Sequence, residues 1–299
     1  LVRPTMDLRA DLFRSTASQL GEGILWHPTR LSLFWVDILG QKIFETRVDS
    51  QDQTVTSLGV EKMIGALVPH RDGSVMAILH DGVYAVDLTA SSVQPHSIPG
   101  LFDTQALRFN DAKCDPWGRL WAGTLSLHGK SKQAALYSYS PRQGWHTQRT
   151  EVSISNGLAW SLDHRTLYYI DSSLKAVQAF DFEPETGSLS HPRTAFDVSS
   201  VPGLPDGCTL DSQGRLWIAH WGGSCVSCWD PIKGKPLGRV TLPVSQVTNC
   251  TFGGARLDTL FITTAACELD AAQRQCEPLA GQLFCADVKT TGLPAVAFE

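Results

Sequence analysis

The same short pattern of turn and strand residues returns along this chain at nearly constant intervals. Two copies are almost identical, Asp115-Pro-Trp-Gly-Arg-Leu-Trp121 and Asp211-Ser-Gln-Gly-Arg-Leu-Trp217. Looser copies begin at Pro28, Arg71, Leu162 and Ala255. In the clearest copies, Asp, Gly or Ser stands where a tight hairpin turn needs such residues, and an apolar strand follows. The chain is therefore predicted to be an array of similar β units.

The interval between the units indicates how they are arranged. Consecutive units open 43, 45, 46, 50 and 43 residues apart, at Glu22, Gly65, Asn110, Asn156, Asp206 and Asn249. Units of about 40–50 residues with several short strands are typical of β-propeller blades. We therefore predict an all-β fold, a single six-bladed β-propeller domain over residues 1–299, with residues 1–15 as an N-terminal extension that closes onto the propeller. A β-sandwich or large barrel would not explain the repeated pattern.

Five of the six opening residues are polar, although each precedes a stretch that should be a buried strand. The first strand of every propeller blade lines the central channel, so these side chains are expected to converge on one point. Glu22, Asn156 and Asp206 would bring two carboxylates and an amide together from three separate blades. Such oxygen donors suit one divalent cation, Ca²⁺ first, with Mn²⁺, Zn²⁺ or Mg²⁺ as alternatives. The competing interpretation is a wet channel lined by hydrogen-bonded polar side chains.

Charge and hydropathy exclude several classes of partner. The formal net charge is -5 over 299 residues, and no basic stripe that would bind nucleic acid stands out. No apolar run approaches the roughly 20 residues needed to cross a bilayer. Residues 1–20 carry charges of both signs and do not resemble a signal peptide. We expect a cytoplasmic protein that does not associate with membranes, and a monomer, because a propeller closes on itself.

The eight cysteines allow more than one interpretation. Cys225 and Cys228 form a C-x-x-C, which could suggest zinc or redox chemistry. No second such pair exists, and the local alternation resembles a strand, so a structural role is favoured. Cys267 and Cys276 flank a polar loop and could form a disulfide, and the sequence does not decide whether either pair is bonded.

Short segments around the polar residues form an ordered set over nearly the whole chain. They include Leu-Gly-Glu-Gly at 20–23, Arg-Phe-Asn-Asp-Ala-Lys at 108–113, Ser-Asn-Gly-Leu-Ala at 155–159, Leu-Pro-Asp-Gly at 204–207, Ala-His-Trp-Gly-Gly at 219–223 and Thr-Phe-Gly-Gly at 251–254. This set resembles the SMP-30/gluconolactonase/luciferin-regenerating (regucalcin-like) family. Each segment alone is a weak signal, whereas the order of all of them is specific.

The resemblance implies a six-bladed propeller that holds one divalent metal at the channel mouth and hydrolyses sugar lactones such as gluconolactone. By position, Glu22, Asn156 and Asp206 match the family's metal ligands. Arg108 and Asn110 match residues that contact the substrate. Asp111, next in the same motif, is assigned as a neighbouring substrate-binding partner, although capping a turn is an equally good explanation for it.

Two departures from the family pattern bear on the substrate. Ile24 stands where many relatives have proline, which should change only local stiffness. The loop 125–133 is short and contains no acidic residue, whereas several relatives have a longer lid there with a substrate-contacting glutamate. The preferred lactone is therefore left open, as is a lid role for this loop.

A chemical mechanism follows as a hypothesis from these assignments. The metal would polarise the lactone carbonyl, and water would attack the carbonyl carbon. Asp206 would accept the proton of that water, or the metal would itself generate the nucleophile. A calcium-binding propeller without catalysis and a related propeller esterase are the alternatives. Arg108 argues for a hydroxylated or anionic substrate and so favours the lactonase.

Overall fold

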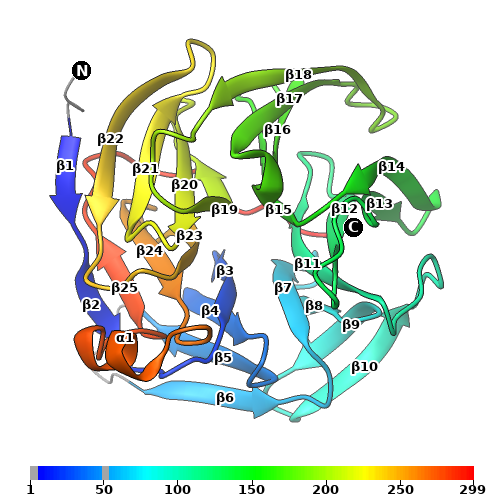
Figure 1. The fold of residues 1–299 in the computed structure, drawn as a ribbon. Coiled ribbons are helices and arrows are strands. Elements are labelled where there is room, and N and C mark those ends of the chain that lie inside the picture. The colour runs from blue at the N-terminus through cyan, green and yellow to red at the C-terminus, as the bar shows by residue number, and fades with distance from the viewer. Residues whose placement is uncertain (1–5, 49–53) are drawn as a thin grey trace.

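The structure is a computed structural model that describes residues 6–48 and 54–299. Six small sheets, antiparallel except for one added N-terminal strand, stand around a central axis like the blades of a propeller (Figure 1). This confirms the predicted all-β fold and its six-bladed architecture. Residues 1–5 of the expected N-terminal extension lie outside the described residues.

The first three blades each contain four strands. They consist of β3 (Gly21–His27), β4 (Ser32–Asp37), β5 (Lys42–Arg47) and β6 (Val55–Gly59); β7 (Ile64–Pro69), β8 (Val75–Leu79), β9 (Gly82–Asp87) and β10 (Ser92–Ser97); and β11 (Leu107–Cys114), β12 (Leu120–Ser126), β13 (Ala134–Ser140) and β14 (Gly144–Val152).

The other three blades follow the same order. The fifth blade has one further strand from the N-terminus, and the sixth takes its outer strand from there. They consist of β15 (Ser155–Trp160), β16 (Thr166–Asp171), β17 (Ala176–Phe182) and β18 (Leu189–Asp197); β19 (Leu204–Leu210), β20 (Leu216–Trp221), β21 (Cys225–Asp230), β22 (Lys235–Thr241) and β1 (Met6–Arg9); and β23 (Val247–Gly253), β24 (Thr259–Thr264), β25 (Leu283–Ala286) and β2 (Asp11–Arg14).

The N-terminal strands join the two ends of the ring. Strand β2 pairs with β25 and becomes the outer strand of the last blade, while β1 pairs in parallel with β22 of the blade before it. These pairings connect residues more than 200 positions apart in the sequence. They cover sheet edges that would otherwise be open.

In each of the two best-matching repeats, one buried aspartate bonds to the residues that recur with it. Asp115 is fully buried, and its Oδ2 accepts hydrogen bonds from Arg119 Nε at 2.6 Å and Trp121 Nε1 at 3.0 Å. Asp211 makes the same two bonds with the arginine and tryptophan of its own repeat. The carboxylate also accepts backbone N–H groups of the turn, so one residue holds the hairpin and anchors the packed tryptophan.

The hydrophobic core lies between neighbouring blades. One cluster joins Trp217 and Val226 of the fifth blade to Leu260 and Phe284 of the sixth, all at most 1% exposed. Another joins Ile78 of the second blade to strands of the third. Each blade thus buries both faces, which explains why the second strands are mainly apolar.

In every blade the pairing between the inner strand and the second strand is irregular at an equivalent position. The pairing with the second strand shifts between Glu22 and Leu25, Ile64 and Ala66, Phe109 and Ala112, Ser155 and Leu158, Pro205 and Cys208, and Val247 and Asn249. β-Bulges of this kind bend a strand and redirect its side chains. The six bulges lie at or beside the residues that open the repeats and turn the polar side chains toward the axis.

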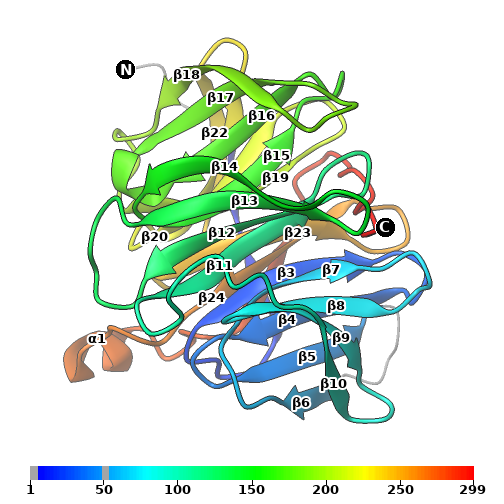
Figure 2. The same ribbon diagram turned by 90° about the vertical axis from the view of Figure 1, so that its right-hand side faces the viewer.

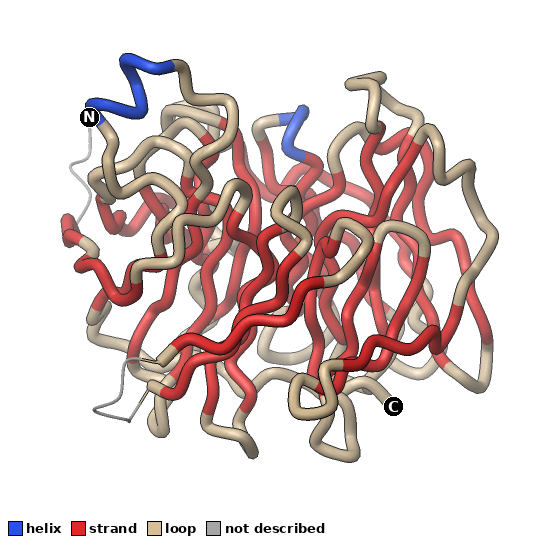
Figure 3. Tube along the Cα trace, turned by 90° about the horizontal axis from the view of Figure 1, so that it is seen from below, coloured by secondary structure: helices blue, strands red, loops and turns tan. Residues whose placement is uncertain are grey.

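The helices and the chain end lie on opposite faces of the disc. The 3₁₀ helix η1 (Ser172–Leu174) and helix α1 (Ala271–Cys276) are on one face, and the C-terminus is on the other (Figures 2 and 3). Inner strands begin at the helix face and end at the C-terminal face. No helix in residues 6–48 and 54–299 is long and apolar enough to cross a membrane.

The two cysteine pairs that the sequence left open are not bonded, since all eight cysteines are free thiols. Cys225 and Cys228 are buried in β21, and burial raises their pKa values to about 11 and about 12. At neutral pH these buried thiols therefore stay protonated and behave as small apolar side chains.

Candidate metal and substrate site

The structure brings all six predicted site residues into one region of the channel. They project from four inner strands, β3, β11, β15 and β19. Each is between 4% and 8% exposed: Glu22, Arg108, Asn110, Asp111, Asn156 and Asp206. Asn249 on β23 joins the same group. The four strands belong to four blades, so only closure of the ring places these residues side by side.

One chain of hydrogen bonds links the predicted substrate contacts to a predicted metal ligand. Arg108 Nη1 donates to Asn110 Oδ1 at 2.9 Å, and Asn110 Nδ2 donates to Asn156 Oδ1, also at 2.9 Å. Asn156 Nδ2 in turn donates to Ser172 Oγ at 2.7 Å. These bonds fix the orientation of both amides, with Oδ1 of Asn156 facing Asn110 and its Nδ2 facing Ser172.

A second pair of bonds orients the carboxylate of Glu22. Its Oε2 accepts hydrogen bonds from Asn249 Nδ2 at 2.9 Å and from the backbone N–H of Gly23 at 2.8 Å. Asn249 Oδ1 accepts the backbone N–H of Cys250. Both donors act on one oxygen, and no side chain or backbone group among the described residues bonds to Oε1 of Glu22, so that oxygen is available to a cation.

Glycines allow the strands to approach this closely. A Cβ atom on Gly207 would overlap the side chain of Asn249, and one on Gly65 would overlap the backbone carbonyl of Asn110. The second blade therefore contributes no side chain to the site, because its strand lies directly against the neighbouring strand.

Three carboxylates in this region carry unfavourable negative charge. Burial, and then the charge of Asp111, raises the pKa of Glu22 to about 7. Burial and the charges of Glu22 and Asp111 hold the pKa of Asp206 well above its ordinary value, and burial also raises that of Asp111. Two cations oppose these shifts, Arg108 acting on Glu22 and Asp206, and Lys113 acting on Asp111. Burial lowers the pKa of Arg108 itself to about 10.

The residues present fit a hard divalent cation. Two buried, mutually repelling carboxylates and a fixed amide oxygen provide the donor types that such an ion prefers, and a cation would relieve their repulsion. Within residues 6–48 and 54–299, no group of three or more His, Cys, Asp or Glu side chains is arranged to hold a metal. The Glu22, Asn156 and Asp206 set includes an amide and so differs from such a group.

Asp111 occupies a different position from the other predicted residues. Its Oδ1 accepts the backbone N–H of Ala112 at 2.8 Å. Its side chain borders a cavity of about 390 Å³ that extends from the site toward the C-terminal face. Asp111 thus lies between the polar cluster and that cavity, where its charge acts on Glu22 and Asp206.

Sequence reasoning missed two residues of the hydrogen-bond network that orients the predicted metal ligands. Ser172 lies in η1 and anchors Asn156, and no repeat or motif marks it. Asn249 stands in the recurring polar register but was assigned no role beyond lining the channel, whereas it is the side chain that orients Glu22. His220, in the Ala-His-Trp-Gly-Gly segment, is fully buried, and its Nε2 forms a hydrogen bond of 2.7 Å with Ser227 Oγ.

Comparison with known proteins assigns the chain to a family. A model of the SMP-30/gluconolactonase/LRE-like region matches residues 20–266. The chain belongs to the SMP-30/gluconolactonase/LRE-like family. The resemblance found in the ordered sequence segments is thereby confirmed.

Two curated relatives match this family member over nearly their whole length. The chain is 37% identical over 289 residues to a Bacillus subtilis (strain 168) protein named "Putative sugar lactone lactonase YvrE", with 97% of this chain and 98% of the relative covered. It is 38% identical over 278 residues to regucalcin of Danio rerio, with 92% of each covered.

Solved structures agree on the architecture of the family. A luciferin-regenerating enzyme superposes with a TM-score of 0.87 at 28% identity, over 97% of this chain and 99% of the other. A calcium-binding protein, regucalcin from Agrobacterium tumefaciens, superposes over 100% of both chains with a TM-score of 0.92. Its identity of 22% makes this second likeness a statement about the fold alone.

Proposed function

We propose that this chain is a metal-dependent lactonase that opens sugar lactones to the corresponding hydroxy acids. The supporting observation is the hydrogen-bond chain from Arg108 through Asn110 to Asn156, which joins a substrate arm to a candidate metal ligand. The similarity to a relative named as a sugar lactone lactonase supports a lactonase-like function. The family relationship to regucalcin suggests a divalent metal, with Ca²⁺ as the first candidate.

Arg108 would position the substrate. Among the described residues, only its Nη1 has hydrogen-bond partners, the carbonyl of Phe109 and Oδ1 of Asn110. Its Nε and Nη2 can therefore donate to hydroxyl or ring oxygens of a lactone. The bonds from Nη1 hold the guanidinium in one orientation, which lowers the entropic cost of binding.

Glu22, Asn156 and Asp206 would hold the cation, which supplies polarisation of the lactone carbonyl when it is bound. Asp206 would accept a proton from the attacking water at a carboxylate oxygen. Burial and neighbouring carboxylates raise its pKa, and a bound cation would bring it down again toward the range of a useful base.

The reaction balances without a further reactant. A bond forms between the water oxygen and the carbonyl carbon, and the ring C–O bond breaks. The proton held at Asp206 passes to the departing ring oxygen, which becomes a hydroxyl. The product acid then ionises in solution and releases one proton for each ring opened.

Proton release at constant pH against a panel of aldonolactones tests the proposal. Turnover above the spontaneous rate is expected with Ca²⁺, Mn²⁺, Zn²⁺ or Mg²⁺ and is expected to disappear with a chelator. Asp206→Asn keeps the size of the side chain but removes its charge, and it should abolish turnover and metal retention. Asp163→Asn, exposed in the turn between β15 and β16 at the other face, is the matched control.

The outcomes separate the candidate functions. If no aldonolactone is opened faster than in buffer with any of the four metals, the chain is not a sugar lactonase. Metal binding that persists under those conditions would instead favour a calcium-binding propeller without catalysis. Full turnover by Asp206→Asn would move the catalytic site elsewhere in the channel.

A further inference from the structure

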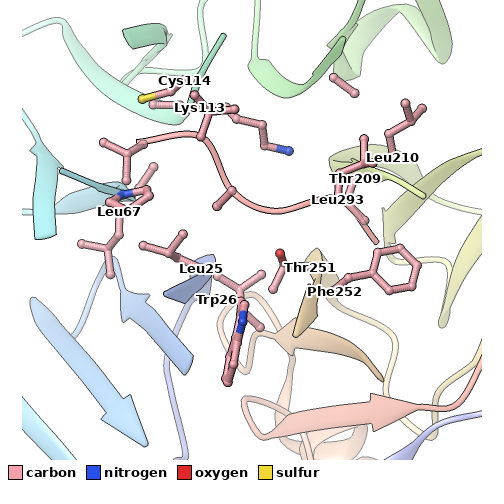
Figure 4. A pocket seen from close by; sticks show the side chains of 18 of the residues that line it. Leu25, Trp26, Leu67, Lys113, Cys114, Thr209, Leu210, Thr251, Phe252 and Leu293 are labelled. Atoms are coloured by element: carbon pink, nitrogen blue, oxygen red, sulfur yellow. The ribbon is translucent and has the colours of Figure 1, made fainter. Parts of the chain in front are cut away.

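A chamber in the channel extends from the candidate metal site toward the C-terminal face. Its volume is about 390 Å³, within the range of about 300–1,000 Å³ that small-molecule sites occupy. Residues of all six inner strands and residues 293–296 line it, and Figure 4 shows side chains around the opening. The chamber walls include Leu25, Trp26, Leu67, Leu210, Thr251 and Phe252.

The chamber has an apolar wall with a single lysine. Lys113 is the only lysine or arginine among the residues that line it. Its Nζ donates to the backbone carbonyl of Cys208 at 2.7 Å, and in Figure 4 the side chain reaches from β11 toward Thr209 and Leu210. An ammonium group has three N–H donors, so two of them are free of this bond.

The carboxylate of Asp111 limits the negative charge that a ligand in the chamber can carry. It borders the inner end, beside the polar cluster, and lies on the same strand as Lys113. Three other titratable side chains line the wall. Burial raises the pKa values of Cys114 and Cys250, and His164 lies in the turn between β15 and β16 near the outer end. A ligand with one negative charge can pair with Lys113, whereas a second charge at the inner end would be repelled by Asp111.

The C-terminal segment closes the outer end of the chamber. It is fastened on both sides, by the bond from Gly292 N to Leu257 O at 2.8 Å and from Phe298 N to Pro69 O at 2.7 Å. Between these anchors, Leu293 is 40% exposed and Val296 is 36% exposed. A segment held only at its two ends can yield to a ligand more easily than a paired strand.

We propose that this chamber binds an amphipathic monocarboxylate of low molecular mass. The carboxylate pairs with Nζ of Lys113, and the apolar body packs against Leu25, Leu210 and Phe252. Charge-assisted hydrogen bonding fixes the head group, and removal of apolar surface from water stabilises the body. The proposed contacts with the ligand, Lys113 and the apolar wall, are distinct from Glu22, Asn156 and Asp206, so binding does not require the lactonase function. Asp111 and Asn249 border both sites.

Calorimetric titration of the full chain with octanoate tests this assignment. Saturable binding of one octanoate is expected. Octanamide, which lacks the charge, and suberate, which carries a second one, should each bind at least tenfold more weakly, a difference of about 1.4 kcal/mol. Absence of saturable octanoate binding, or equal affinity for octanoate and octanamide, would overturn the proposal.

Variants locate the site. Lys113→Met should weaken octanoate binding at least tenfold and leave octanamide binding as it was, while Lys42→Met on the exposed surface should change neither. Thr251→Leu, which fills the chamber, should weaken both ligands. Full octanoate affinity in Lys113→Met would refute the role of the lysine, and this result can be read even if Thr251→Leu fails to fold.

The same titration separates this chamber from the catalytic proposal. Asp206→Asn should retain octanoate binding, whether or not the chain proves to be a lactonase. Loss of octanoate binding in that variant, or its recovery only when metal is added, would assign the ligand to the candidate metal site and overturn the second site.

Discussion

Replacing Glu22 by glutamine tests the electrostatic reasoning about the site. In the folded, metal-free chain the pKa of Glu22 is raised from its ordinary value of 4.5 to about 7, by burial first and then by the charge of Asp111. Between these pH values the folded chain keeps the proton and the unfolded chain has lost it. The free energy of unfolding therefore falls as pH rises through this window.

The size of the effect follows from the two pKa values. One pKa unit corresponds to about 1.36 kcal/mol, so Glu22 alone should lower the free energy of unfolding by about 3 kcal/mol between pH 4.5 and about 7. Glu22→Gln cannot ionise, yet its amide oxygen can still accept from Gly23 and Asn249. The variant should lack this part of the pH dependence.

Urea unfolding in the presence of a chelator, at several pH values across that window, measures the difference. Glu61→Gln, at an exposed position, is the matched control and should follow the unmodified chain. Adding a divalent cation should flatten the profile of the unmodified chain, because the cation favours the ionised carboxylate. If the free energy of unfolding falls equally with pH in Glu22→Gln and in the unmodified chain, the folded structure does not raise the pKa of Glu22 as described.

Three further changes test other contacts. Ser172→Ala removes the hydroxyl that accepts a hydrogen bond at 2.7 Å from the proposed amide ligand, and it should weaken divalent-metal binding about tenfold or more in a metal titration; unchanged affinity would contradict the ligand assignment. Arg119→Met leaves the carboxylate of fully buried Asp115 without its ion pair and should lower the free energy of unfolding by about 3–5 kcal/mol in urea, whereas no loss would show that the turn alone satisfies that carboxylate. Gly207→Ala adds a methyl group that overlaps a channel amide and should reduce lactone turnover, while Gly59→Ala, which has open space around it, should not; equal turnover would show that the strands can separate.

The recurrence of short patterns was enough to predict the fold. A turn and the apolar strand after it are specified by residues only a few positions apart. The hydrogen bond from Trp121 to Asp115 is an example, because both partners belong to the same repeat. Six such units at a regular spacing leave few architectures possible. Glu22 and Asp206 stood out for the same reason, since a polar residue interrupts a pattern that is otherwise apolar.

The sequence could not show how the polar positions are used. Ser172 reaches Asn156 across 16 positions, and Asn249 reaches Glu22 across 227, so neither contact has a local signal. Gly65 opens a repeat like the other five residues, yet the close approach of Asn110 leaves no room for a side chain there.

The sequence by itself determined the propeller, the blade register and the set of polar side chains facing the channel, because those depend on periodicity within each unit. Only the tertiary structure decided which of them touch, which oxygens remain open, and that Asp111 divides a polar mouth from an apolar chamber around Lys113. Those features arise where six bulged strands and the C-terminal segment meet at one axis. Contacts there join residues from opposite ends of the chain, and their geometry is set by the closure of the ring.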